Sequence, residues 1–300
     1  MVSRSQAAVL AALQSRPPEE APWWDDALCR PVAFAGWRPA AAGRDDWGVT
    51  WSPVDPDAPS PAGSRANIPT PCRPKGHGAR LAPTVGRDPG VPGPTDSDEH
   101  GSALYASAHP AQCAAGLLSL RFPDGRDPAP FSGLREQAQA AGRVLTIGLH
   151  PLGPLDRLSA LLGAERALPA LLDEPEACRA VIDRIADYHV RIAGHYLAAG
   201  AEAGWLADDY AGDAGPLVRP ALWRELFLPG LARIIKVYRD AGALCFFHTC
   251  GRAGDLLPDL LAAGVTAFNL EPGACDRPGL RGRFGPAMTF IGAPAWLGGA

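Results

Sequence analysis

Two pairs of chemically capable side chains in this 300-residue sequence each follow a short apolar run. Asp208 and Asp209 come directly after the run GWLA, and His248 and Cys250 lie at the end of the run ALCFF. Carboxylates serve in acid–base chemistry, whereas imidazole and thiolate groups are good zinc ligands. Because one residue separates His248 from Cys250, their side chains point the same way on an extended segment. The second pair therefore predicts part of a zinc site.

The apolar runs that precede these pairs are separated by stretches with helical spacing, which is typical of buried parallel strands. In barrels of parallel strands, the residues at the carboxyl ends of the strands form the active site. We therefore expect the acidic pair and the His-x-Cys pair to share one site. Further strand-end residues extend that expectation: the candidate catalytic residues are Asp208, Asp209 and Glu271, the candidate substrate-binding residues are His150 and Tyr210, and the candidate metal ligands are His248 and Cys250.

Each of these residues also has a purely structural interpretation. Adjacent aspartates face opposite sides of a strand, so we expect one of Asp208 and Asp209 to enter the barrel mouth, while the pair could instead cap a turn. His150 could be an ordinary solvent-exposed histidine at a strand end. Cys250 could be a small buried hydrophobic residue beside a hydrogen-bonded His248.

Composition bounds the class of protein. A net charge of −4 and 47% hydrophobic residues predict a globular chain without the basic surface that nucleic acid or an anionic membrane requires. No run approaches the roughly 18 apolar residues of a membrane-spanning helix. The N-terminus does not resemble a signal peptide, and seven cysteines without a CxxC pair predict free thiols. We therefore expect a cytoplasmic protein.

The chain divides into three expected regions. Residues 1–51 read as an N-terminal helix and the start of a barrel, and DDWGVTW at 45–51 alternates in the manner of a small hairpin arm. Residues 52–115 are rich in Pro, Gly and Ser without apolar periodicity, which indicates an irregular low-complexity insert, a disordered linker or out-of-frame translation. Residues 116–300 show alternating strand and helix patterns. That alternation predicts an α/β fold of the TIM-type (β/α) barrel.

The expected elements of the third region are specific enough to compare with a structure. GLLSL at 116–120 reads as a strand fragment, and 132–142 reads as a helix that begins at Ser132. A long helix is expected over 175–200, and Pro229 should split a later one. About six strands can be found where an eight-fold barrel needs eight, and the sequence ends soon after the last of them. The barrel is therefore expected to be incomplete at its C-terminus.

From about Pro123 to Gly292 the sequence resembles the uroporphyrinogen decarboxylase family. The segments that carry the resemblance occur in the family's order and spacing: FPDGRDPAPFSGLREQ, LLGAERALPALLDEPE, ADDYAG, RPALWRELFLP, AGALCFFHTCG and LLPDLLAAGVTAFNLEP, with DDWGVTW as an earlier one. The family is a TIM-type barrel shared by the decarboxylase of haem synthesis and by corrinoid-linked methyltransferases. This sequence departs from both, because it lacks the arginine-rich N-terminal loop of the decarboxylases and ends before the late zinc-binding cysteine of the methyltransferases.

The resemblance implies a methyltransferase-like member that uses zinc to move a methyl group between a corrinoid and a thiol. In that interpretation His248 and Cys250 bind zinc, Asp208 or Asp209 positions the thiol, and Cys275, Glu271 or Asp209 supplies a third ligand. The partners would be a small thiol or tetrapyrrole substrate and a corrinoid protein. One alternative is a metal-free uroporphyrinogen decarboxylase of porphyrin biosynthesis. Another is a non-catalytic member that only binds a ligand.

Overall fold

The computed structural model describes residues 9, 11, 29–34, 42–53, 104–141, 145–269, 277–285 and 287–291. Its centre is a sheet of six strands, all parallel to their neighbours. Their spatial order follows the chain: β1 (Cys29–Val32), β5 (Leu145–Leu152), β6 (Ala203–Ala207), β9 (Leu244–His248), β10 (Ala267–Asn269) and β11 (Thr289–Ile291). The expected α/β fold with parallel strands is confirmed. Within the described residues the sheet is open, with β1 and β11 as its edges.

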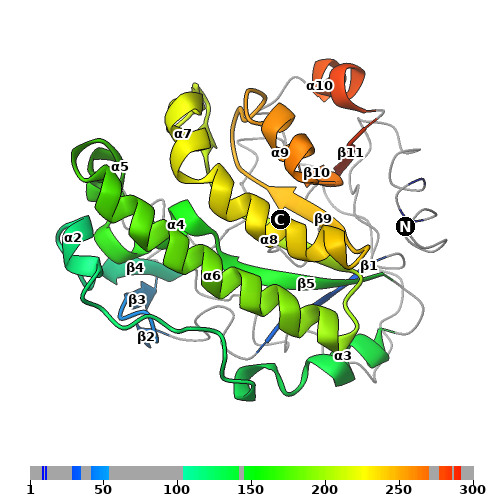
Figure 1. Cartoon of the computed structure of the whole chain (residues 1–300), viewed down its shortest axis with the longest axis horizontal. Helices are drawn as coiled ribbons and strands as arrows, with labels where there is room; N and C mark the ends of the chain where they lie inside the picture. The colour runs from blue at the N-terminus through cyan, green and yellow to red at the C-terminus, as the bar shows by residue number, and fades with distance from the viewer. Residues whose placement is uncertain are drawn as a thin grey trace.

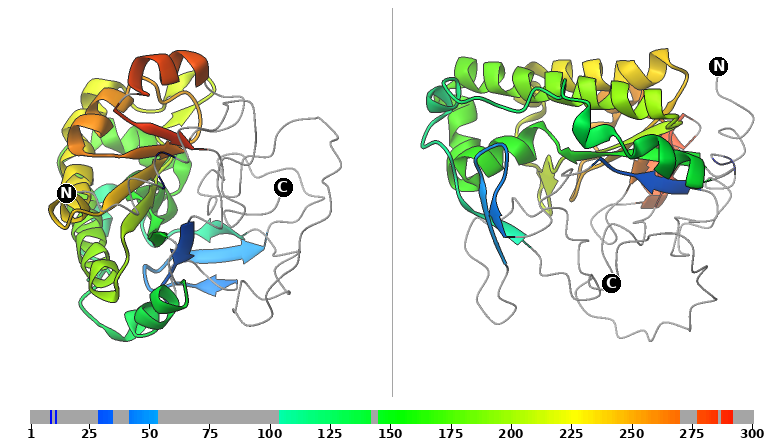
Figure 2. Two further views of the ribbon diagram at one scale, coloured as in Figure 1. Left: turned by 90° about the vertical axis from the view of Figure 1, so that its right-hand side faces the viewer. Right: turned by 90° about the horizontal axis from the view of Figure 1, so that it is seen from below.

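Helices connect successive strands and cover one face of this sheet (Figures 1 and 2). They are α4 (Pro154–Leu162), α5 (Ala164–Asp173), α6 (Pro175–Ala199), α7 (Pro220–Leu226), α8 (Leu228–Asp240), α9 (Leu257–Ala263) and α10 (Arg277–Phe284). The expected long helix is confirmed as α6, and it ends at Gly200 in the left-handed conformation that glycine adopts without strain. Pro229 does separate α7 from α8, as expected, since proline fits only the first turn of α8.

The two faces of the sheet have different partners. Alternate residues such as Leu149, Trp205 and Phe246 form one buried cluster on the inner face. The outer face packs closely on α6 and α8 because glycines on the strands lie beneath aromatic rings. A Cβ atom at Gly204 would lie 2.2 Å from Cζ of Tyr238, which leaves room only for glycine.

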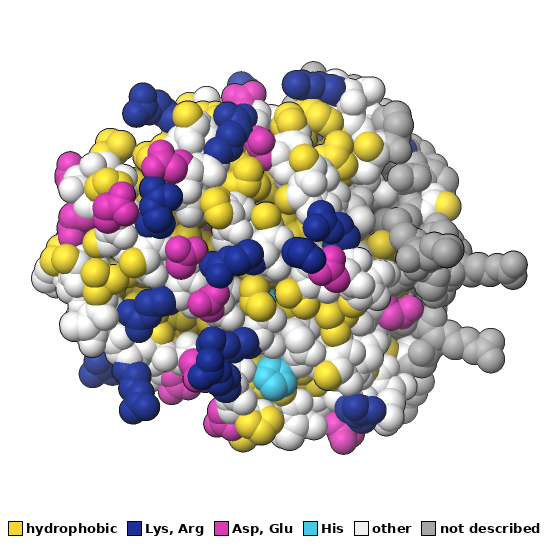
Figure 3. Space-filling view, in the orientation of Figure 1, with side chains coloured by type: hydrophobic (Ala, Val, Ile, Leu, Met, Phe, Trp, Pro, Cys, Tyr) yellow, Lys and Arg dark blue, Asp and Glu magenta, His cyan; other side chains and the backbone are white. Residues whose placement is uncertain are grey.

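The outer surfaces of α6 and α8 carry interspersed basic and acidic side chains, visible in Figure 3. Several of them pair between the helices. Arg233 on α8 contacts Asp183 and Asp187 on α6, with N···O distances of 2.9 and 2.6 Å. Exposed pairs of this kind stabilise a fold by about 0–1 kcal/mol each, so this face is a solvated surface rather than a site.

A second, antiparallel sheet lies at one end of the molecule. Its strands are β2 (Gly43–Arg44), β3 (Thr50–Pro53) and β4 (Leu104–Ala108). Asp45 organises the turn between β2 and β3 by accepting hydrogen bonds from the backbone N–H groups of Trp47 and Val49 and from Trp51 Nε1. Its carboxylate also pairs with the buried Arg157 of α4 at 3.2 Å. The DDWGVTW element is thereby fixed to helix α4, which follows β5 of the main sheet.

Two sequence expectations need correction in this part of the chain. The segment 52–115 is not irregular at its two ends, because Ser52 and Pro53 belong to β3 and residues 104–108 form β4, which pairs with β3. Residues 116–120 do not form a strand; helix α2 (Ala114–Leu117) covers the first of them. Cross-strand pairing and helix packing, which local composition does not encode, decide both outcomes.

The remaining early elements agree with expectation in kind but differ in their bounds. The helix expected over 132–142 is present, after a 3-10 turn, η2 (Ala129–Phe131), as the shorter α3 (Leu134–Ala140). Its N-cap is Gly133 rather than Ser132. The expected N-terminal helix and residues 54–103 of the expected insert lie outside the described residues, apart from positions 9 and 11. None of the described helices combines the length and apolarity that crossing a membrane requires.

Candidate metal centre

The carboxyl ends of β6 and β9 lie side by side and are joined by several hydrogen bonds. Ala207 and His248 are register partners, and the N–H of Asp208 donates to the carbonyl of His248 at 3.0 Å. Beyond the strands, the N–H of Cys250 donates to Asp209 Oδ1 at 2.9 Å. The two polar clusters that the sequence placed at strand ends therefore meet at one edge of the sheet.

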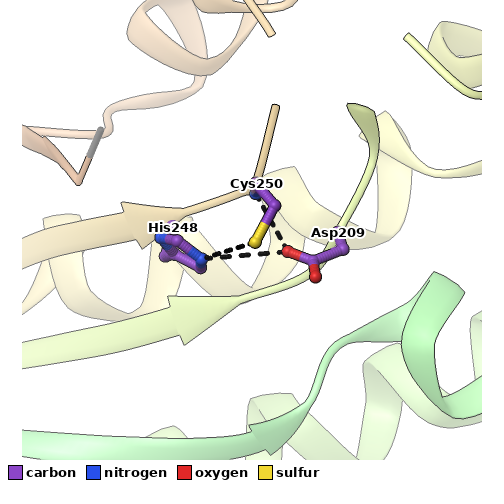
Figure 4. Close-up of side chains that lie close together, drawn as sticks. All are labelled: Asp209, His248 and Cys250. Atoms are coloured by element: carbon purple, nitrogen blue, oxygen red, sulfur yellow. Dashed lines mark hydrogen bonds and ion pairs between the residues drawn. The ribbon is translucent and has the colours of Figure 1, made fainter. Parts of the chain in front are cut away.

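Three potential ligand atoms converge there (Figure 4). Cys250 Sγ lies 3.4 Å from His248 Nε2, and Asp209 Oδ1 lies 3.8 Å from the same nitrogen. One ligand atom from each of the three residues lies within 4.8 Å of the others. The side chains of His248 and Asp209 are 10% and 30% exposed, so the cluster is shielded but reachable from solvent.

The donor set and its spacing fit a zinc ion. Zinc takes nitrogen, sulfur and oxygen ligands at about 2.0–2.3 Å in tetrahedral geometry, which places neighbouring ligand atoms about 3.4–3.6 Å apart. The distances of 3.4 and 3.8 Å to Nε2 require shifts of a few tenths of an ångström, and the separation between Cys250 Sγ and the Asp209 carboxylate, which is within 4.8 Å, would also close when an ion binds. Three protein ligands would leave the fourth position open, as in catalytic zinc sites.

The same residues could be read as a cysteine nucleophile with a histidine base and an orienting carboxylate, but the geometry opposes that interpretation. In such an arrangement the carboxylate contacts the ring nitrogen that faces away from the nucleophile. Here the thiol and the carboxylate both approach Nε2 of His248. Nδ1 of His248 is buried and has no hydrogen-bond partner among the described residues. Convergence on one nitrogen favours a shared ion.

Asp208 has a different role from its neighbour. Its two carboxylate oxygens accept hydrogen bonds from the backbone N–H groups of Leu155 and Asp156 at 3.0 and 2.8 Å, so Asp208 caps the first turn of α4 from a neighbouring strand. Burial raises the pKa of Asp208, and the backbone donors oppose that shift. Of the acidic pair, Asp209 turns toward His248 and Cys250, while Asp208 anchors a helix. The expectation that one of the two enters the site agrees with this arrangement.

His150 lies on the opposite face of the sheet from His248. Its Nδ1 contacts Nδ1 of His189 on α6 at 3.0 Å, and its Nε2 contacts the hydroxyl of Tyr238 on α8 at 2.6 Å. The side chain is 3% exposed, so the interpretation as a solvent-exposed histidine is wrong. Strand β5 continues to Leu152, which places His150 before the strand end and toward the helices. The cluster at β6 and β9 does not include it.

The last two candidates are Tyr210 and Glu271, and the structure describes the first of them. Tyr210 is buried among aromatic rings of the helix layer, 5.5 Å from Trp223 and 5.2 Å from Phe227 between ring centroids. The Tyr210 hydroxyl lies close enough to Asp208 to lower the pKa of that carboxyl group, but it forms no hydrogen bond of normal geometry with the described residues. Glu271, the third candidate catalytic residue, lies outside the described residues, as does Cys275.

Sequence reasoning missed two residues that hold the cluster in place. Thr249 Oγ1 accepts a hydrogen bond from the N–H of Tyr210 at 2.8 Å, and Asp156 Oδ2 accepts one from the N–H of Asp209 at 3.3 Å. Burial and the carboxylates of Asp209 and Asp208 raise the pKa of Asp156. Thr249 sits between the two predicted ligands, which was a usable signal. Asp156 resembles any aspartate in the first turn of a helix, so nothing in the sequence signalled its contact with Asp209.

Gly251 closes the cluster on the side of Cys250. Its φ of +71° is unfavourable for other residues, and a Cβ atom there would lie 2.6 Å from the Cα of Gly212. Gly212 belongs to a small hairpin of β7 (Ala211–Gly212) and β8 (Gly215–Pro216). The backbone after Cys250 therefore passes directly under this hairpin.

Comparisons with known proteins identify a family and include a similar solved structure. A methyltransferase from Methanosarcina mazei matches with a TM-score of 0.49 and 18% identity, over 63% of this chain and 55% of that one. This chain thus spans about half the length of that structure. No curated protein matches this chain. Residues 132–293, more than half of the chain, match the family described as uroporphyrinogen decarboxylase (URO-D). The chain belongs to the uroporphyrinogen decarboxylase family.

Proposed function

We propose that this protein is a zinc-dependent, methyltransferase-like member of the uroporphyrinogen decarboxylase family that transfers a methyl group from a corrinoid to a thiol. The observation that carries the proposal is the convergence of Cys250 Sγ and Asp209 Oδ1 on Nε2 of His248. The two alternatives for the thiol–imidazole contact, a nucleophilic relay and simple burial, do not explain why the carboxylate of Asp209 approaches the same ring nitrogen as the thiol.

Each of the three residues has a defined part in this proposal. His248 at the end of β9 and Cys250 just beyond it would hold the ion, and Asp209 would complete the set from the segment that follows β6. The Cys250 N–H that donates to Asp209 fixes the carboxylate, so little reorganisation is needed when the ion binds. A zinc ion held there would lower the pKa of a substrate thiol at the open position and so supply a thiolate near neutral pH.

The proposed reaction balances without a further reagent. The thiol releases its proton to solvent, and its sulfur forms a bond to the methyl carbon with its own electron pair. The bond between that carbon and cobalt breaks, and its electron pair stays with the corrinoid. The chain's contribution is to position the sulfur and to neutralise its charge, which is where preorganised sites are most effective.

The test is a methyl-transfer assay with zinc-loaded protein, methylcobalamin and a small thiol such as 2-mercaptoethanol, followed by detection of the methyl thioether. The wild-type protein should form the thioether, and Cys250→Ser and Asp209→Ala should each lose that activity together with bound zinc. Cys113→Ser is the matched control, because Cys113 is an exposed thiol at the start of α2 and is not one of the three residues of the cluster.

A second arm of the same experiment examines the decarboxylase alternative. Wild-type protein is incubated with uroporphyrinogen in the presence of a zinc chelator, and coproporphyrinogen is measured. Formation of coproporphyrinogen at a rate that Cys250→Ser does not change would replace the methyltransferase proposal with a decarboxylase. Full zinc binding by Cys250→Ser would also contradict the proposal.

A further inference from the structure

The inner face of the sheet ends in one layer of four side chains next to the candidate metal centre. Register partners across four strands place Ala207, His248, Asn269 and Ile291 side by side. Alternation with Phe246 and Ala267, which belong to the inner cluster, assigns His248 and Asn269 to that same face. Both are buried, at 8% and 1% exposure. His248 and Asn269 are therefore direct neighbours, on strands about 4.8 Å apart.

One ring nitrogen of His248, Nδ1, needs a hydrogen-bond acceptor within this layer. An imidazole that binds a metal through Nε2 as a neutral ring carries its proton on Nδ1, and that N–H normally donates to a nearby acceptor. Nδ1 of His248 is buried and has no hydrogen-bond partner among the described residues. A buried donor left without an acceptor costs about 1–3 kcal/mol. A functional metal ligand in this position needs an acceptor close by.

Asn269 offers one. Its Nδ2 donates to the carbonyl of Ile291 at 3.2 Å, toward the β11 side of its strand. With Nδ2 engaged on the β11 side, Oδ1 is the atom of this carboxamide that can accept a hydrogen bond from the neighbouring strand β9, where His248 is the register partner of Asn269. The other two side chains of the layer, Ala207 and Ile291, have no polar atoms. Among the described side chains of this layer, Asn269 therefore carries the one acceptor available to His248.

We propose that Asn269 is a positioning residue of the metal centre: when His248 binds zinc through Nε2, a small rotation of the two neighbouring side chains brings the Nδ1–H of His248 to Oδ1 of Asn269, and this bond then holds the imidazole with Nε2 directed at the ion. The inference rests on the proposed zinc site and adds a residue to it. Asn269 does not touch the ion. It acts through His248 by fixing both the tautomer and the orientation of the ring.

The test is a zinc titration of the folded protein in competition with a chromophoric chelator, using wild type, Asn269→Leu and Asn269→Asp. Leucine preserves the volume but removes both polar atoms. Aspartate keeps an acceptor and loses the donor to Ile291. Thr146→Val is the matched control, because it removes a different buried hydrogen bond of the sheet, from Thr146 Oγ1 to the carbonyl of Gly200 at 3.2 Å. Nitrogen-15 NMR of the histidines in each zinc-loaded protein reports the His248 tautomer independently of activity.

We expect Asn269→Leu to weaken zinc binding about 10- to 100-fold, the usual effect of losing such a partner, and to remove the hydrogen-bonded Nδ1–H resonance. Asn269→Asp should retain wild-type affinity or exceed it, and Thr146→Val should leave affinity unchanged. Equal affinity in wild type and Asn269→Leu would overturn the inference while leaving the zinc site intact. Equal weakening in Asn269→Leu and Asn269→Asp would also overturn it, since the bond to Ile291 would then be the cause. Absence of zinc binding by the wild type would instead refute the proposed function, and this inference with it.

Discussion

A buried chain of hydrogen bonds between the sheet and its helices makes the stability of this protein sensitive to mild acid. Nε2 of His189 faces the carbonyl of Leu152 at 3.0 Å, so it must be the protonated donor. In a neutral ring Nδ1 of His189 is then an acceptor, and it receives the Nδ1–H of His150. Nε2 of His150 in turn accepts from the hydroxyl of Tyr238. One carbonyl thus determines the tautomers of both histidines.

This series of hydrogen bonds cannot accommodate an additional proton on either histidine. Protonation of either ring would set one donor against another, in addition to the cost of burying a charge. Burial lowers the pKa of His189 to about 3, and burial with the neighbouring His189 lowers that of His150 well below its ordinary value. In the unfolded chain both histidines titrate near 6.5. Between these values the unfolded state binds more protons than the folded state, so stability falls as the pH falls.

The size of the effect follows from the pKa difference. A group that titrates at 6.5 when unfolded and stays neutral when folded lowers the free energy of unfolding by about 1.4 kcal/mol per pH unit below 6.5. At pH 5 the loss is about 2 kcal/mol for His189, and His150 adds up to a similar amount. Since domains are typically stable by about 5–15 kcal/mol, the loss is easily measured. It begins below pH 6.5 and ends near pH 3, where His189 becomes protonated in the folded state.

Urea unfolding of wild type, His189→Gln and His195→Gln at several pH values between 7.5 and 5 measures these slopes. The His189→Gln protein should lose about 1.4 kcal/mol per pH unit of the wild-type slope below pH 6.5, whatever its stability at neutral pH. His195 lies on the same helix but contacts the carbonyl of Gly125 and takes no part in the hydrogen bonds of His150 and His189. The His195→Gln variant therefore shows the general effect of removing a histidine from α6. Equal slopes in wild type and His189→Gln would refute the reasoning.

Two further changes should alter stability in ways that urea unfolding can measure. Gly204→Ala places a Cβ atom 2.2 Å from Cζ of Tyr238 and should lower the free energy of unfolding by about 1–3 kcal/mol. The control Gly194→Ala, at an exposed α6 position with open space, should raise it by about 0.5–1 kcal/mol. An unchanged free energy of unfolding in Gly204→Ala would contradict the close packing. Arg157→Met leaves the carboxylate of Asp45 without its ion-pair partner at 3.2 Å and should lower the free energy of unfolding by about 3 kcal/mol. Adding Asp45→Asn should restore part of that loss. Additive effects of the two substitutions would argue against an interaction between these residues.

The placement of His248 and Cys250 was predictable because it needs only local information. Residues two apart on an extended segment share a face, and strand ends of a parallel sheet share an edge. The choice between Asp208 and Asp209 was not predictable in the same way. It depends on the N–H groups of α4, which recruit Asp208 as a cap across 52 and 53 residues of sequence.

The position of His150 shows where strand patterns become uninformative. Strand β5 is buried on both faces along its whole length, so its sequence has no alternation of polar and apolar residues to assign the faces. The end of β5 is also set by pairing with β6, which carries it to Leu152. A histidine in such a strand cannot be assigned to the barrel mouth or to the helix layer from sequence alone. The described structure assigns it to the helix layer.

The small antiparallel sheet was the least predictable part of the fold. Strand β4 has only five residues at the border of an irregular segment, and it pairs with β3 from the other side of the segment 54–103. Asp45 and Arg157, which fix this sheet to α4, are 112 residues apart in sequence. Contacts of this range are decided by the tertiary fold, which local propensities do not contain.

X-ray absorption spectroscopy of zinc-loaded protein tests the central claim, a metal centre built from His248, Cys250 and Asp209, most directly. We predict one sulfur at about 2.3 Å and two or three nitrogen or oxygen atoms at about 2.0–2.1 Å from zinc, with the sulfur shell lost in Cys250→Ser. A spectrum without sulfur in the wild type, or one that Cys250→Ser leaves unchanged, would contradict it.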